Sequence, residues 1–145
     1  AIEHFPTNST MHPAPRQKHE EMIHSRLTEL DIEVVILSGY MRILSPWFVE
    51  RWEGRLLNIH PSLLPKFPGA HAHKDVLDSG ENITGCTVHF VDMGVDSGQI
   101  IAQREVIVEQ GDTIETLSER VKKVEHVLYP EIIDALAMGK LSQQT

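Results

Sequence analysis

The stretch Arg55-Leu56-Leu57-Asn58-Ile59-His60-Pro61-Ser62-Leu63-Leu64-Pro65 decides the fold of this chain. Its apolar beginning predicts a buried strand, which an amide, an imidazole and two prolines bring to an end. Parallel strands of open α/β sheets bind ligands beyond their carboxyl ends. At the two-residue period of a strand, Asn58 and His60 project to the same side. An amide that polarises a carbonyl and an imidazole that carries a proton suit acyl transfer, provided that another segment supplies a carboxylate.

The segments around this strand predict a parallel α/β arrangement for the first half. A helix is expected from about Arg16, with a helical spacing of Met22, Ile23, Leu27 and Leu30. The β-branched run at 33–39 predicts a strand covered on both faces. Ser45 and Pro46 are typical of a helix start, and a further helix is expected at 73–79, closed by Gly80. The resulting order is helix, strand, helix, strand, helix.

The second half predicts an antiparallel strand pair and a long helix. Apolar and polar residues alternate at 84–91 and 99–108, which is typical of strands with one wetter face. Asp112 and Glu115 suggest a capping box that opens a helix ending at Gly139, with Pro130 expected to kink or split it. The chain is therefore expected to be one α/β domain over residues 1–145, with a mostly parallel sheet, an antiparallel C-terminal strand pair and a long C-terminal helix.

The composition and charge of the chain argue against several classes of protein. The 145 residues carry a formal net charge of -8, which argues against general binding to nucleic acids or anionic membranes. The single cysteine, Cys86, can form no intrachain disulfide, and its environment predicts a small buried side chain. No apolar run approaches the roughly 18 residues that span a bilayer, and no signal peptide is visible. We therefore expect a cytoplasmic protein.

A few side chains are candidates for chemistry. A lone histidine at a strand end is more often structural than catalytic. With Asn58 and the rigid proline loop beside it, a catalytic role for His60 is as well supported as a structural one. Asp96 lies in a glycine-flanked loop and on its own is a turn residue. Beside His60, its carboxylate would favour the imidazolium and raise the pKa of that histidine. His89 is expected to be a packed or hydrogen-bonded core residue, and the His71-Ala72-His73 segment has no further ligands at the spacing of a metal site.

Four runs of sequence carry a resemblance to a known family. They are Gly39-Tyr-Met-Arg-Ile-Leu-Ser45, Leu56-Leu-Asn-Ile-His-Pro-Ser-Leu-Leu-Pro-Lys-Phe-Pro-Gly69, Gly85-Cys-Thr-Val-His-Phe-Val91 and Asp96-Ser-Gly-Gln-Ile-Ile101. From about Arg16 to Gly139 the chain resembles the phosphoribosylglycinamide formyltransferases, folate-dependent enzymes of purine synthesis. The Asn-x-His-Pro-Ser-Leu-Leu-Pro element is also found in methionyl-tRNA formyltransferases and 10-formyltetrahydrofolate hydrolases. The segments at 66–73 and 124–130 favour the glycinamide enzymes.

The resemblance implies a Rossmann-like formyltransferase fold and a role for each site residue. His60 would be the catalytic acid, Asn58 would polarise the formyl carbonyl, and Asp96 would raise the pKa of His60. The co-substrate would be 10-formyltetrahydrofolate, with no metal. Its pocket would be lined by Arg16, Met41, Arg42, Ile43, Leu44, Asn58, Asp92, Met93, Gly94, Val95 and Asp96. Glycinamide ribonucleotide would meet Lys122, Lys123, Val124 and Glu125, with Glu125 accepting hydrogen bonds from ribose hydroxyls.

The same resemblance predicts that the first β-α-β portion of the fold is missing. In the family the substrate phosphate rests on a glycine-rich loop after the first strand, and the chain shows no such loop. The 145-residue chain by itself is therefore expected to be nearly inactive. An exposed sheet edge is expected to favour association, including a homodimer.

Three other functions stay open at this point. A 10-formyltetrahydrofolate hydrolase would keep the folate site and give the formyl group to water. A methionyl-tRNA formyltransferase is disfavoured by the acidic charge and by the lack of a basic RNA-binding segment. A folate- or nucleotide-binding fragment without turnover is the non-enzymatic alternative. The expected partners are small molecules, not nucleic acids or membranes.

Overall fold

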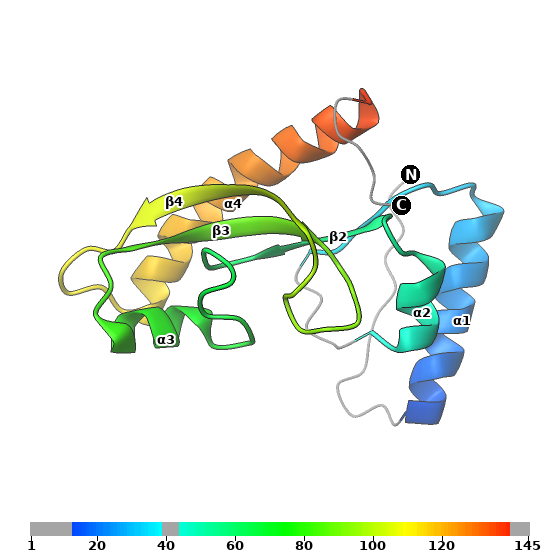
Figure 1. The fold of residues 1–145 in the computed structure, drawn as a ribbon, viewed down its shortest axis with the longest axis horizontal. Coiled ribbons are helices and arrows are strands. Elements are labelled where there is room, and N and C mark those ends of the chain that lie inside the picture. Colours follow the sequence, from blue (N-terminus) through cyan, green and yellow to red (C-terminus); the bar gives the residue numbers. More distant parts are fainter. Residues whose placement is uncertain (1–12, 39–43, 140–145) are drawn as a thin grey trace.

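A mixed sheet with the strand order β1-β2-β3-β4 forms the centre of the described structure, which is a computed structural model covering residues 13–38 and 44–139 (Figure 1). The elements follow the chain as α1 (Pro13–Glu29), β1 (Val35–Ile36), α2 (Pro46–Arg51), β2 (Leu56–His60), α3 (Ala72–Ser79), β3 (Ile83–Phe90), β4 (Ile100–Ile107) and α4 (Ile114–Ala137). The expected α/β fold with an antiparallel C-terminal pair and a long final helix is confirmed. The sheet was expected to be mostly parallel, but within the described residues it is mixed, because β1–β2 is parallel and both β2–β3 and β3–β4 are antiparallel.

The pairing of β2 with β3 determines which side chains share a face. These strands are antiparallel, with Asn58 opposite His89 and His60 opposite Thr87. Residues directly opposite one another in an antiparallel pair project to the same face. The intervening residues, which include Ile59 and its partner Val88, belong to the hydrophobic core on the other face. One face of the sheet is therefore polar at β2 and β3, and the other face is apolar.

Helix α4 covers the apolar face. Its Leu117, Val121 and Leu128 are fully buried in the core that includes Leu57 and Val88 of the sheet. The hydroxyl of Tyr129 donates to the carbonyl of Leu37 at 2.6 Å, which ties the helix to the end of β1. Burial raises the pKa of the Tyr129 phenol well above its usual value, so this side chain stays a donor. The sheet and α4 together give the polar face a rigid support.

Helices α1 and α2 lie side by side and enclose a second apolar cluster (Figure 1). Ile23 and Leu27 pack there as expected, whereas Met22 and Leu30 are 58% and 37% exposed, against the expectation. Residue 20, a glutamate, is fully buried instead. Its carboxylate accepts hydrogen bonds from the backbone N–H of Ser45, at 3.0 Å, and from the hydroxyl of the same residue. A buried carboxylate requires such donors, and here the residue that caps α2 supplies them.

Three local expectations were wrong. Strand β3 is buried on both faces apart from its first residue, because the segment after β2 covers the face that α4 does not. The cap of α4 is Thr113, whose capping box is completed by Thr116 and not by Glu115. Helix α1 begins at Pro13, before Arg16. Of the two effects expected of Pro130, the split does not occur, because α4 continues through this residue.

The boundary predictions at Ser45 and Gly80 are confirmed, whereas the strand expected at 33–39 is limited to Val35–Ile36 in the described residues. Ser45 caps α2 and Pro46 opens it, and Gly80 closes α3 in the left-handed conformation with φ of 75°. In the described residues, no helix combines the length and the apolar character that a bilayer crossing needs.

Candidate active site

A cavity of about 430 Å³ opens at the carboxyl end of β2 and along the loop at 91–98. Its walls combine aliphatic side chains from several elements with a cluster of polar groups. The aliphatic part includes Leu37, Leu44, Val49, Val91, Met93 and Val95, and the polar part includes Asn58, His60, His89, Asp92, Asp96 and Ser97. Apolar walls with a few convergent polar groups are typical of small-molecule sites.

The imidazole of His60 is held through both ring nitrogens. Its Nε2 lies 2.8 Å from the carbonyl oxygen of Phe67, and its Nδ1 lies 3.4 Å from Oδ2 of Asp96. A carbonyl only accepts, so Nε2 carries a hydrogen and Nδ1 is the nitrogen available for chemistry. The Phe67 backbone has φ of 53°, which is unfavourable for a side chain of this size. Such strain is typical of functional sites, and here it accompanies a carbonyl that fixes the histidine.

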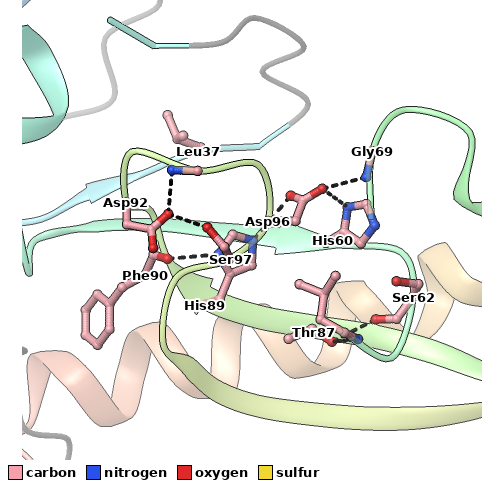
Figure 2. A network of polar contacts seen from close by, with 12 residues as sticks. Leu37, His60, Ser62, Gly69, Thr87, His89, Phe90, Asp92, Asp96 and Ser97 are labelled. Atoms are coloured by element: carbon pink, nitrogen blue, oxygen red, sulfur yellow. Dashed lines mark hydrogen bonds and ion pairs between the residues drawn. The ribbon is translucent and has the colours of Figure 1, made fainter. Parts of the chain in front are cut away.

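The carboxylate of Asp96 is oriented by the loop that carries it. Asp96 has φ of 53°, a conformation that aspartate tolerates better than most residues. Oδ2 accepts the backbone N–H of Gly69 at 2.8 Å, in addition to facing His60 (Figure 2). The side chain is only 12% exposed, so solvent screens its contact with His60 little.

The loop itself is closed by local hydrogen bonds. Oδ1 of Asp92 accepts the N–H of Gly94 at 2.8 Å. The same oxygen accepts the hydroxyl of Ser97, also at 2.8 Å (Figure 2). At Gly98 the backbone passes so near β3 that a Cβ would lie 1.6 Å from the carbonyl oxygen of Phe90. Glycine is therefore required where the loop returns to the sheet.

Asn58 and His89 complete the polar face of the cavity. Asn58 is half-buried two residues before His60, on the same side of β2, as expected. His89 lies opposite it on β3, is 2% exposed and directs Nδ1 at the carbonyl oxygen of Phe90, at 2.9 Å. The expectation of a buried, hydrogen-bonded His89 is confirmed, and its place in the cavity wall is an addition.

The segment after His60 is attached to β3 through a buried threonine. The Thr87 hydroxyl donates to the carbonyl of Ser62 at 2.7 Å and accepts the N–H of Leu64 at 3.1 Å. The side-chain amide of Gln103 donates to the same hydroxyl and to the carbonyl of Leu64, each at 2.9 Å. The hydroxyl of Ser62 in turn donates to the carbonyl oxygens of Lys66 and Phe67. These bonds fix the carbonyl that holds His60.

The sequence profile of the formyl transferase family matches residues 3–133, which is most of the chain. The chain belongs to the formyl transferase family. Its site residues lie within the matched segment.

Named relatives agree with this membership. The chain is 52% identical over 124 residues to the human "Trifunctional purine biosynthetic protein adenosine-3", covering 86% of the chain and 12% of that protein. It is 48% identical over 124 residues to the phosphoribosylglycinamide formyltransferase of Escherichia coli, covering 83% of the chain and 57% of that enzyme. It thus spans little more than half of that enzyme and about a tenth of the trifunctional protein.

Solved structures show the same fold. Glycinamide ribonucleotide transformylase 1 from Symbiobacterium toebii matches 92% of the chain and 65% of its own chain, with a TM-score of 0.85 and 43% identity. Phosphoribosylglycinamide formyltransferase from Anaplasma phagocytophilum matches 84% of the chain and 60% of its own, with a TM-score of 0.82 and 42% identity.

The structure brings most of the expected folate-pocket residues of this formyl transferase together. Leu44, Asn58 and the segment from Asp92 to Asp96 line the cavity. Met41, Arg42 and Ile43 lie outside the described residues, as does the side chain of Arg16.

The expected nucleotide-binding residues lie on α4, outside the cavity wall. Lys122 and Lys123 are exposed, and Val124 and Glu125 are half-buried. Burial raises the pKa of the Glu125 carboxyl. On α3, burial and then the charges of His60 and Lys122 lower the pKa of His73. The pKa of His73 therefore depends on charges from both the candidate site and α4.

Sequence reasoning missed several groups of this site. The carbonyl of Phe67 and the N–H of Gly69 are backbone groups and leave no composition signal. Thr87 and Gln103 look like ordinary strand residues until the pairing of β3 is known. The signal that could have found His89 is its register opposite Asn58, which requires β2 and β3 to be paired.

Proposed function

We propose that this chain carries the catalytic centre of a phosphoribosylglycinamide formyltransferase. The reaction moves the formyl group of 10-formyltetrahydrofolate to the amine of glycinamide ribonucleotide, as in de novo purine synthesis. The carrying observation is that the Nδ1 of His60 and Oδ2 of Asp96 are 3.4 Å apart in a cavity that Asn58 also lines. The relatives named for this activity support the choice of substrates.

The cavity suits the folate. Its volume of about 430 Å³ lies in the usual range for small-molecule sites, and its aliphatic walls suit a flat heteroaromatic ring. The folate supplies a formyl carbon that is open to attack by an amine. Among the cavity residues, the loop at 91–98 offers backbone polar groups that suit the edge of such a ring.

His60 and Asn58 act on the formyl oxygen. Negative charge develops on that oxygen as the amine attacks, and the Asn58 amide and a proton on His60 Nδ1 stabilise it. Because Nε2 of His60 is bonded to the carbonyl of Phe67, the ring cannot turn its other nitrogen toward the substrate without losing that bond. Asp96 stabilises the imidazolium through the contact at 3.4 Å and offers an acceptor for the proton that leaves the amine.

The nucleotide is assigned to the face of α4 next to α3. Lys122 supplies a positive charge there, and the Glu125 carboxylate suits the ribose hydroxyls. The charges of Lys122 and His60 both lower the pKa of His73, which supports a small separation between this face of α4 and the proposed catalytic centre.

The proposal includes a cytoplasmic location and small molecules as the partners. The net charge of -8 and the single cysteine of the sequence support both. Homodimer formation stays a prediction, to be measured by sedimentation.

The test measures formyl transfer, with and without glycinamide ribonucleotide, by an intact enzyme that contains this chain, because the 145 residues alone are expected to be nearly inactive. We expect formylated nucleotide with little free formate, and a loss of about 10²–10³ in kcat for Asn58→Ala. His60→Ala is expected to lose at least as much, whereas Glu119→Gln, an exposed site on α4, keeps the wild-type rate. Formate release that does not depend on the nucleotide would identify a hydrolase instead. Near-wild-type rates in both the Asn58 and the His60 variants would reject the proposed centre.

A further inference from the structure

A second imidazole faces the carboxylate of Asp96, from the side opposite His60. Nε2 of His89 lies 3.7 Å from Oδ1, whereas Nδ1 of His60 lies 3.4 Å from Oδ2 (Figure 2). Oδ2 also accepts the N–H of Gly69 at 2.8 Å. Each oxygen of one carboxylate therefore faces a different histidine.

The two histidines are anchored in the same way. Nε2 of His60 lies 2.8 Å from the carbonyl oxygen of Phe67, and Nδ1 of His89 lies 2.9 Å from that of Phe90. Since a carbonyl only accepts, each of these nitrogens carries a hydrogen. A neutral imidazole has one N–H, so the second nitrogen of each neutral ring would direct a lone pair at a carboxylate oxygen.

For His89 that arrangement is unfavourable without a further proton. Its Nε2 is buried, and within the described part of the chain no group lies in hydrogen-bonding reach of it. The ring is 3% exposed, so water screens little of the repulsion between its lone pair and Oδ1. A proton on Nε2 converts the same contact into an ion pair.

The other charged and polar groups nearby do not change this assignment. Asp92, on the same loop, has Oδ1 bonded to Gly94 and Ser97, and its side chain is exposed. Asn58, opposite His89 on β2, is neutral. On β2 the titratable neighbour is His60, whose charge also lowers the pKa of His73 on α3. Asp96 is therefore the acid that faces Nε2 of His89.

We propose that His89 is a positioning residue for Asp96, with a proton on Nε2 that holds Oδ1 and leaves Oδ2 directed at His60. Two histidines then share one carboxylate, and the orientation of Asp96 toward His60 depends on His89. The kinetic consequence rests on the proposed function, whereas the placement of the proton rests on the geometry of the chain.

The proton is tested without any substrate, by ¹⁵N NMR of the histidines near neutral pH. We expect both nitrogens of His89 to be protonated in the wild type. Asp96→Asn is expected to shift Nε2 toward the unprotonated value and to leave Nδ1 protonated. Val88→Ala, on the same strand but facing the core, should leave the His89 spectrum unchanged. An unprotonated Nε2 in the wild type, or one indifferent to Asp96→Asn, overturns the proposal.

The kinetic test compares two replacements of His89. Glutamine keeps an N–H donor near the position of Nε2, and phenylalanine keeps the bulk of the ring without a donor. We expect His89→Phe to lower kcat about tenfold with a displaced pH profile and little change in KM, and His89→Gln to recover most of that loss. Equal kcat values and wild-type pH profiles in both variants would contradict a positioning role. An intact wild-type enzyme that contains this chain and shows no formyl transfer would reject the proposed function, and the NMR result would still decide where the proton lies.

Discussion

At the scale of single residues, the site depends on backbone groups as much as on side chains. The carbonyl of Phe67 selects the tautomer of His60, and the N–H of Gly69 holds the oxygen of Asp96 that faces it. Both Phe67 and Asp96 have φ of 53°, so the chain accepts unfavourable backbone conformations at the two positions that orient the centre. The loops that carry Phe67 and Asp96 thus set the geometry of the proposed site.

Gly98 offers a residue-scale prediction. Alanine there would place its Cβ 1.6 Å from the carbonyl oxygen of Phe90, so the loop that carries Asp96 has to move. We expect Gly98→Ala to lower kcat/KM by about 10²-fold, because displacements near 1 Å have effects of this size.

Gly111→Ala is the matched control for that measurement. Gly111 also has a positive φ, 85°, but an added Cβ there meets nothing within 4 Å. It should cost about 1–2 kcal/mol of stability through backbone strain and leave turnover intact. Equal activity of the two variants would show that the path of the loop does not position Asp96.

At the scale of elements, β3 connects the site to the core. One face of the strand carries His89 and Thr87 toward the cavity and the segment after β2, and the other face packs Cys86 and Val88 in the core. Helix α4 is fixed at its start by a cluster around Asp112, away from the site. Stability and site geometry can therefore be perturbed separately.

Thr87 tests the attachment of the catalytic segment to β3. The fully buried hydroxyl bonds Ser62, Leu64 and Gln103, so Thr87→Val leaves the N–H of Leu64 without this acceptor. We expect a loss of about 1–3 kcal/mol in the free energy of unfolding, measured by urea denaturation. Thr87→Ser keeps the hydroxyl and should cost about 1 kcal/mol for the lost methyl group. Equal losses in the two variants would mean that the hydroxyl does not anchor the segment.

Asp112 gives a pH-dependent prediction for α4. Hydrogen bonds from the Arg120 guanidinium hold the pKa of this carboxyl well below its usual value. A lowered pKa in the folded state means that the unfolded chain binds more protons, so the stabilisation is complete above about pH 4 and is lost as pH falls further. Asp112→Asn should therefore lower Tm near neutral pH, with a difference that shrinks in acid.

The control is Glu119→Gln, which makes the same charge change at an exposed position of α4. It should leave Tm nearly unchanged across the same pH range. A Tm difference for Asp112→Asn that stays constant into acid would contradict the assigned role of the Arg120 contact.

At the scale of the whole molecule, the features that the sequence predicts are those that follow from the periodic spacing of residues in strands and helices. The strand period placed Asn58 and His60 on one face, and helical spacing placed Ile23 and Leu27 in an apolar cluster. The contact between Asp96 and His60 was expected from the family resemblance, because no local pattern joins residues so far apart. Burial of Glu20 and the antiparallel pairing of β2 with β3 depend on tertiary packing, and His89 was missed as a site residue for that reason.

The reactivity of the Cys86 thiol measures how tightly the core around β3 is packed. It is the one cysteine of the sequence, its side chain is fully buried in β3, and burial raises the pKa of the thiol to about 11. Alkylation near neutral pH should therefore be slow in the native protein and fast in urea, because the thiolate forms only after the core opens. The destabilised Thr87→Val variant should react faster than the wild type. Rapid labelling of the native wild type would contradict a closed core around β3.

The most direct test of the central claim is a double-mutant cycle of kcat/KM between His60→Gln and Asp96→Asn. If the contact at 3.4 Å makes these residues one catalytic unit, the double variant should lose little beyond the larger single loss, within about threefold. Losses that multiply would show two independent contributions and contradict the account.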